Sequence, residues 1–136
     1  MLNTIALDAK TYWGASGSQA ATELTIAREV SITSSAAEAD LSSRASSYKL
    51  SKPSLKDLSI EITMLNDADD AGYVAFRNAY NGGTPIAVYA RDRASGEGPD
   101  ADFCVFGMSR PEPLEGEIVV SFTLKPTRTA RAPAWN

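Results

Sequence analysis

The fold is decided by DLSIEITMLNDADDAGYVAFRNAYNGG, residues 57–83, which reads as a strand that leads directly into a short helix. From Asp57 to Met64 apolar and polar residues alternate, and a period of two is typical of a strand with one buried face. The apolar positions are Leu58, Ile60, Ile62 and Met64, and the polar positions are Asp57, Ser59, Glu61 and Thr63. This strand is therefore predicted to anchor one side of the core.

The alternation stops at Leu65, and the residues that follow predict a helix. The carboxylate of Asp67 is suited to cap the helix, and Asp69 and Asp70 place negative charge in the first turn, where the helix dipole favours it. The glycine pair at 82–83 ends the helix, because glycine adopts a left-handed cap at the least cost. A narrow apolar stripe, suited to lying on a sheet, recurs at helical spacing: Gly72, Ala75, Phe76, Ala79 and Tyr80.

The composition predicts one domain spanning residues 1–136. Hydrophobic residues make up 43% and charged residues 22%, close to the averages for globular proteins. No apolar run approaches the roughly 20 residues that span a bilayer, and residues 1–13 lack the apolar block of a signal peptide. A lone cysteine, Cys104, rules out an intrachain disulfide framework. We therefore expect a protein made in the cytoplasm, without membrane association.

The absence of histidine narrows the possible functions. Without an imidazole there is no histidine general base, no Ser/His or Cys/His nucleophile pair and no histidine metal site, so most hydrolase mechanisms are excluded. The net charge of −4 argues against a general nucleic-acid binder, since affinity for the phosphate backbone comes largely from Lys and Arg. We expect no cofactor, no metal and no enzymatic activity.

The rest of the chain predicts more strands and two long connections. Arg28 interrupts the alternation of one strand and suggests an edge or an interface, while another is apolar on both faces and should be central, with Cys104 buried in it. The predicted strands are 4–13, 24–32, 84–91, 103–108 and 117–125. The serine-rich stretch 34–53 is predicted to be an extended loop, either disordered or used for binding. A turn-rich loop is predicted over 92–102 and an extended tail over 126–136.

These elements predict an α+β, mainly β fold: a β-sandwich or small barrel with one flanking helix and a long inter-strand loop. Two of its strands carry a face of Ser, Thr and charged side chains without large apolar groups. A solvated outer surface explains such a face, because antiparallel sheets commonly have one. The pattern alone favours this interpretation, and the functional alternative is a sheet face that lines a wet channel.

Four motifs that suggest chemistry have simpler explanations. DADDAG (67–72) places two Asp and a Gly as in a calcium loop, but Ala71 stands where an oxygen ligand belongs and Asn78 stands where the bidentate Glu belongs, so helix capping explains it better. Gly96 and Gly98 precede no helix, so a phosphate-binding loop is unsupported. Cys104 has no histidine partner to activate it as a nucleophile. The carboxylates near the proline turn are typical of solvated surface groups: Glu112, Glu115 and Glu117.

In its order of segments the chain resembles the tail tube proteins (major tail proteins) of long-tailed bacteriophages. The resemblance is carried by REVSITSSAAEADLSSRA at 28–45, LKDLSIEITMLNDADDAGYVAFRNAYNGGTPIAVYA at 55–90 and EGEIVVSFTLKPTRTARAPAW at 115–135. These segments cover over half of the chain. They give a strand ending in EADLSSR, a polar loop, a strand, an acid-capped helix, a GTPI strand and a last strand that runs into a proline-bearing tail with a terminal Trp.

The resemblance implies a structural virion protein without catalytic residues. Its subunits would form hexameric rings that stack into the conduit for DNA ejection, in a virion tail assembled in the host cytoplasm. Implied partners are further copies of the chain and the tail tip or baseplate, tape measure and tail terminator proteins, and DNA would pass without specific binding. The polar strand faces then become candidates for the lumen: Ser59, Glu61, Thr63, Ser121 and Thr123.

By the same resemblance, the long loop and the tail would contact neighbouring subunits or rings. The candidate interface residues are Arg28, Asp40, Arg44, Tyr48, Lys49, Arg128, Arg131 and Trp135. Tubes of contractile tails, of secretion apparatus and of gene transfer agents would look similar. Two alternatives from other classes are a monomeric immunoglobulin-like binding or decorating module and a small enzyme that uses carboxylates; a monomeric solution mass would favour the module.

Overall fold

A computed structural model describes residues 9–45, 47–93, 95–129 and 131–136. In this part of the chain one helix accompanies eight strands, so the α+β, mainly β prediction is confirmed. The elements are β1 (Lys10–Ala15), β2 (Thr22–Glu23), β3 (Ala27–Asp40), β4 (Ser51–Leu65), α1 (Ala71–Gly82), β5 (Ile86–Arg91), β6 (Pro99–Ser109), β7 (Val119–Pro126) and β8 (Ala134–Trp135). No helix in the described ranges is long and apolar enough to cross a membrane.

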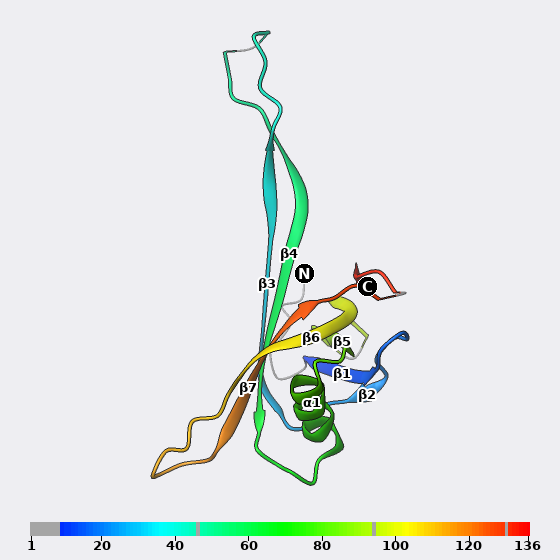
Figure 1. Cartoon of the computed structure of the whole chain (residues 1–136), viewed down its shortest axis with the longest axis vertical. Coiled ribbons are helices and arrows are strands. Elements are labelled where there is room, and N and C mark those ends of the chain that lie inside the picture. Colours follow the sequence, from blue (N-terminus) through cyan, green and yellow to red (C-terminus); the bar gives the residue numbers. More distant parts are fainter. Residues whose placement is uncertain (1–8, 46, 94, 130) are drawn as a thin grey trace.

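The strands form one antiparallel sheet in the order β2-β1-β5-β6-β7-β4-β3, and β8 pairs with β6. The sheet curls, and α1 lies beside it as the single flanking helix, while β3 and β4 continue far beyond the body as a two-stranded hairpin (Figure 1). The long strand β6 joins the two halves, because its first residues pair with β5 and its last residues pair with β7. The result is a curled half-barrel with a projecting arm.

The core lies between α1 and the concave side of the sheet. The predicted alternation in β4 is confirmed, since Ile60, Ile62 and Met64 are fully buried and pair across to the buried residues of β7. Phe76 of the helix stacks on Phe122 of β7 with ring centroids 5.7 Å apart. Burial of these large apolar side chains supplies the main driving force for folding.

The helix begins three residues later than predicted. Asp70 is the N-cap, and its carboxylate accepts hydrogen bonds from the backbone N–H groups of Gly72 and Tyr73. Asp67 was the predicted cap, but its carboxylate accepts from the N–H of Asp69 and so stabilises the turn before the helix. Neither Asp69 nor Asp70 therefore lies in the first helical turn.

The predicted helical stripe is correct at its centre and shifted at its edge. Gly72, Phe76 and Ala79 are buried as predicted, whereas Tyr80 is exposed and Tyr73 takes its place in the core. A side chain on Gly72 would meet Leu24 at 2.4 Å, which explains why the helix carries glycine at this contact. The predicted C-cap is confirmed at position 83, where glycine is left-handed with φ 65°.

Half of the predicted loop at 34–53 is strand. β3 continues to Asp40 and β4 begins at Ser51, with these two residues paired, so that only residues 41–50 connect the strands. The side chains on this arm are exposed and give no apolar alternation. Backbone pairing forms the arm, and the hydroxyls of Ser51 and Ser54 add hydrogen bonds to the carboxylate of Glu38 and the carbonyl of Ala37. Likewise, β6 begins at Pro99, inside the predicted loop 92–102.

The remaining strand predictions hold with shifted bounds. The predicted strand 24–32 begins at Ala27 in β3, while 84–91, 103–108 and 117–125 correspond to β5, part of β6 and β7. The predicted strand 4–13 lies largely outside the described residues, and β1 covers its last part. In the predicted extended tail, β8 forms a short strand.

Candidate functional site

A polar face covers the side of the sheet opposite the core, on β3, β4 and β7, and its rows continue across to Gly107 and Ser109 at the end of β6. Register places its side chains in rows across the strands, so that Ser31, Glu61 and Thr123 lie in one row and Glu29, Thr63 and Ser121 in the next. The hydroxyls of Thr63 and Ser121 are 3.0 Å apart and share a hydrogen bond. We call this set the polar face: Glu29, Ser31, Thr33, Ser59, Glu61, Thr63, Ser121 and Thr123.

The structure brings all five predicted lumen candidates together on this face. Glu61 is exposed, and the four hydroxyl residues Ser59, Thr63, Ser121 and Thr123 are half-buried beside it. Their strand neighbours Ile60, Ile62 and Phe122 are fully buried on the opposite side. The alternation in sequence was a sufficient signal, because each strand has one face in the core and the other face away from it.

Sequence analysis missed Phe106, which is 64% exposed. It lies at a register shift between Val105 and Gly107, where a bulge leaves it without a direct partner on β7. Cys104, predicted to be buried, is only half-buried and pairs in register with Lys125. The prediction that 103–108 is covered on both faces is therefore wrong, because this half of β6 has an uncovered face.

Two strands that carry the polar face have open edges within the described residues. β3 pairs only with β4. β6 pairs with β5 over residues 100–103 and with β7 from Phe103 onward, so residues 105–109 have a strand on one side only. Open edges expose unpaired backbone groups and favour pairing with another strand. The polar face is thus bounded by two edges suited to accept strands of other copies.

The projecting hairpin carries four of the predicted interface residues: Asp40, Arg44, Tyr48 and Lys49. All four are exposed. Hydrogen bonds from the side chain and the backbone N–H of Ser42 lower the pKa of Asp40 below its usual value. The backbone of Leu41 also donates to the carbonyl of Leu50 at 2.8 Å, which closes the base of the tip. The tip therefore presents its side chains outward from a hydrogen-bonded turn.

Arg28 is exposed on β3 and forms an ion pair with Glu117, which precedes β7. Both side chains are more than half exposed, so the pair contributes little to stability. The position of Arg28 on an edge strand agrees with the prediction of an edge. Its role at a subunit interface stays a prediction.

Arg131 binds two buried carboxylates of its own chain. Its guanidinium donates to Asp100 at 2.6 Å and to Asp102 at 3.1 Å, and both Asp side chains are almost wholly buried. The hydroxyl of Thr129 and the backbone N–H of Gly17 also donate to Asp102. We call this group the carboxylate clasp: Gly17, Asp100, Asp102, Thr129 and Arg131.

Burial disfavours the charged form of Asp102, but hydrogen bonds from Thr129, Gly17 and Arg131 outweigh it and lower the pKa of that carboxyl. Burial likewise opposes the charge of Arg131, and its bonds to Asp100 and Asp102 raise the pKa of the guanidinium. Both groups are therefore charged in the folded chain. The signal that could have predicted a strand at this place is the alternation of DADF at 100–103, in which the apolar Ala101 and Phe103 are two residues apart.

The C-terminal segment, residues 127–136, is held against its own chain by these contacts. Gly98 and Asn136 exchange two backbone hydrogen bonds, and Tyr89 donates its hydroxyl to the carbonyl of Asn136. Trp135 and Arg128 remain exposed. Sequence analysis placed this tail on a neighbouring subunit, whereas Arg131 in this structure engages its own body. For Arg128 and Trp135 the interface assignment stays a prediction.

Among the described residues, no group of three or more His, Cys, Asp or Glu side chains is placed to hold a metal ion. The acidic run at 67–70 forms a turn and a helix cap instead. Glu112 is exposed and lies 3.9 Å from Arg110.

The sequence matches no protein-family model and no curated protein. Solved structures do match the fold over nearly the whole chain. The SPP1 tail tube, at 15% identity and a TM-score of 0.77, matches over 98% of this chain and 79% of its own. The tail of an empty gene transfer agent particle with C6 symmetry matches at 14% identity and a TM-score of 0.81, over 98% and 99% of the two chains. A baseplate chain of the anti-feeding prophage matches at 5% identity and a TM-score of 0.60, over 100% and 97%. The fold is therefore that of tail tube subunits.

Proposed function

We propose that this protein is a self-assembling tail tube subunit whose copies form hexameric rings that stack into a conduit for DNA. The observation that carries the proposal is the likeness of the whole fold to a tail described with C6 symmetry, at a TM-score of 0.81. The polar face and its two open edges give this likeness a physical basis. They supply a surface that suits the inside of a tube and edges that suit its closure.

In the proposed ring, the open edge of β3 in one subunit pairs with the open edge of β6 in the next. Such pairing extends the sheet from copy to copy and satisfies backbone groups that the isolated chain leaves open. The same two surfaces are used between each pair of neighbours, so the contact is heterologous and closes when the rotation per subunit divides a full turn. Six copies would then form one continuous barrel.

The polar face would line the bore of this barrel. Glu29 and Glu61 supply negative charge, and the neighbouring residues supply hydroxyls. Carboxylates repel the phosphate backbone, and the two Glu of this face outnumber the one cation, Lys125, that alternation adds two residues after Thr123 on β7. DNA would therefore pass with little adhesion. All five candidate lumen residues belong to the polar face: Ser59, Glu61, Thr63, Ser121 and Thr123.

The proposed location is the virion tail, assembled in the host cytoplasm. Proposed partners beyond the chain itself are the tape measure protein inside the tube, the terminator at one end and the tail tip or baseplate at the other. The projecting hairpin, with Asp40, Arg44, Tyr48 and Lys49, would reach a neighbouring subunit or ring, and Arg28, Arg128 and Trp135 would contact neighbours at the body. We propose no catalytic role for any residue.

The likeness to a baseplate chain of the anti-feeding prophage favours one alternative, a tube subunit of a contractile or secretion-type apparatus. In that alternative the subunit would form the same ring and bore, and a contractile sheath would surround the tube. A monomeric binding module has no need of the two open edges.

Solution mass and negative-stain imaging of the purified protein test the proposal. We expect hexamers or longer polymers, and rings or tubes in the images. A monomer at every concentration, with no ring or tube in the images, would overturn the proposal and favour the binding module.

A further inference from the structure

A groove of about 420 Å³ lies where the base of the β3–β4 hairpin meets the C-terminal segment. Its walls are mostly apolar, and the exposed ring of Trp135 forms one side. Lys56 also lines the groove and brings an amine to it. The residues that shape it are Lys56, Leu58, Pro99, Pro126, Pro133 and Trp135.

A second feature lies at the opposite end of the body, where the β6–β7 loop, residues 110–118, projects away from the hairpin (Figure 1). Leu114 at this loop is fully exposed, with 102% of its reference surface open to solvent. Pro111 and Pro113 restrict the backbone next to it, so little conformational freedom would be lost on binding. A single exposed leucine is ordinary on a surface. The groove at the other end gives this one a partner of matching chemistry.

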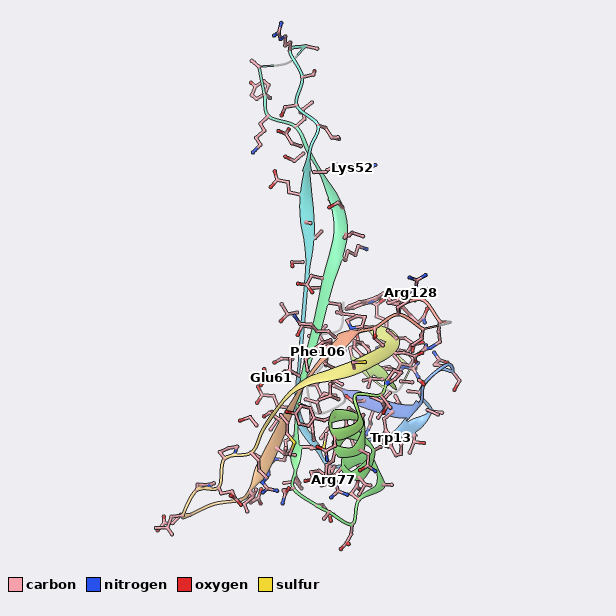
Figure 2. All side chains as sticks on the ribbon, in the orientation of Figure 1. Trp13, Lys52, Glu61, Arg77, Phe106 and Arg128 are labelled. Atoms are coloured by element: carbon pink, nitrogen blue, oxygen red, sulfur yellow. The ribbon has the colours of Figure 1, made fainter. Side chains whose placement is uncertain are left out.

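The charges of the two ends are complementary. Glu112 and Glu115 flank Leu114 on the loop, and Glu115 has no ion-pair partner among the described residues. The groove end carries Lys56 in its lining and Lys52 farther along the arm, and Figure 2 shows Arg128 on the same end of the body. An acidic loop with an apolar tip thus faces away from an apolar groove that carries the cation Lys56 in its lining.

We propose that the β6–β7 loop of one copy inserts Leu114 into this groove of a copy in the adjacent ring, with Glu112 and Glu115 near Lys56. The inference rests on the proposed function, because it assigns the contact by which rings stack. The two surfaces lie at opposite ends of one chain, so their contact is head-to-tail and repeats without closing. Repetition of that kind produces a filament, which is the form a stacked tube requires.

Cysteine cross-linking tests the contact directly. In a Cys104→Ser background, Leu114→Cys combined with Ser34→Cys, which lies in the groove lining, should form disulfides between copies on assembly. A non-reducing gel should then show a ladder of dimers, trimers and longer chains. The control combines Leu114→Cys with Thr22→Cys on the exposed strand β2, and it should stay monomeric. Tubes that form without the ladder, or a disulfide confined to one chain, would overturn the proposal.

Substitution of Leu114 provides a second test that separates stacking from ring formation. Leu114→Asp should raise the protein concentration needed for tube formation at least about tenfold, because it removes the leucine that the proposed contact buries and puts a charge there. Leu114→Met should change that concentration little, because it keeps an apolar side chain of similar volume. The exposed position predicts unchanged melting temperatures for both. Rings without tubes for Leu114→Asp support the contact. Equal tubes for both variants overturn the contact alone, whereas the absence of rings from the unsubstituted protein overturns the proposed function.

Charge reversal sharpens the assignment of Lys56. Lys56→Glu should weaken tube formation several-fold, and the added change Glu115→Lys should restore it in part, since the opposite charges would again meet. Restoration supports the pairing of these two ends. A double variant no better than Lys56→Glu would contradict it.

Discussion

The projecting hairpin and the C-terminal segment were both expected to contact neighbouring copies, yet only the C-terminal segment packs against its own chain. The C-terminal segment is held on its own body by the carboxylate clasp, in which Arg131 meets two buried aspartates. The hairpin extends into solvent, and its described residues from 37 to 55 are exposed apart from the half-buried Ala39. Buried contacts with its own body complete the C-terminal segment, whereas the hairpin is stabilised by backbone pairing and a few exposed side-chain hydrogen bonds. The second region is therefore the stronger candidate for contact with other copies.

The largest expected effect comes from breaking the clasp. Arg131→Ala leaves Asp100 and Asp102 buried without their cation, and removal of one partner from a buried ion pair typically costs about 3–5 kcal/mol. The free energy of unfolding, measured by denaturant titration, should fall by this order. Arg128→Ala is the matched control, because Arg128 is exposed and its loss should change stability by about 0.5 kcal/mol at most. Equal stability of the two variants would mean that the clasp does not hold the segment.

A smaller effect is expected when the pH is changed, again at the buried carboxylates of the clasp. The pKa of Asp102 is lower in the folded chain than in the unfolded chain, so its charge stabilises the fold above the unfolded value of about 3.9. This contribution is lost as the pH falls through the lower, folded pKa. The stability difference between the unsubstituted protein and Asp102→Asn should therefore be constant near neutral pH and shrink below about pH 4. A difference that grows on acidification would contradict the assignment.

The smallest effect on stability is expected from removal of the hairpin. Ala36 and Lys56 are paired in register, so deletion of residues 37–55 and their joining by Asn-Gly should leave a two-residue hairpin turn. Because the deleted side chains are exposed, the free energy of unfolding should change by less than about 1 kcal/mol. Assembly into tubes, followed by negative-stain imaging, should be lost. A shortened protein that assembles normally would show that the arm has no role in contact between copies.

Sequence predicted the core elements of this fold better than it predicted the hairpin or the clasp. The strand at 57–64 and the helix that follows were predictable, because their apolar residues repeat with periods of two and about 3.6 that one buried face imposes. The outer hairpin was not, since Ser, Ala and charged residues exposed on both faces leave no apolar period to detect. The clasp was not predictable either: Asp100 and Asp102 meet Arg131 only through the tertiary fold, about 30 residues along the chain. The polar face was predictable from the alternation of residues, but whether it lines a bore depends on how copies of the chain assemble.

The central claim is that the polar face lines a bore closed by copies of this chain. Glu61→Cys in a Cys104→Ser background tests it, because Glu61 is exposed in the subunit and the substitution should not disturb the fold. A maleimide attached to a polymer too large to enter a tube should label Cys at this position in dissociated subunits and fail to label it in assembled tubes. Thr22→Cys on β2 should react in both states. Full labelling of position 61 in assembled protein would place the polar face outside and contradict the account.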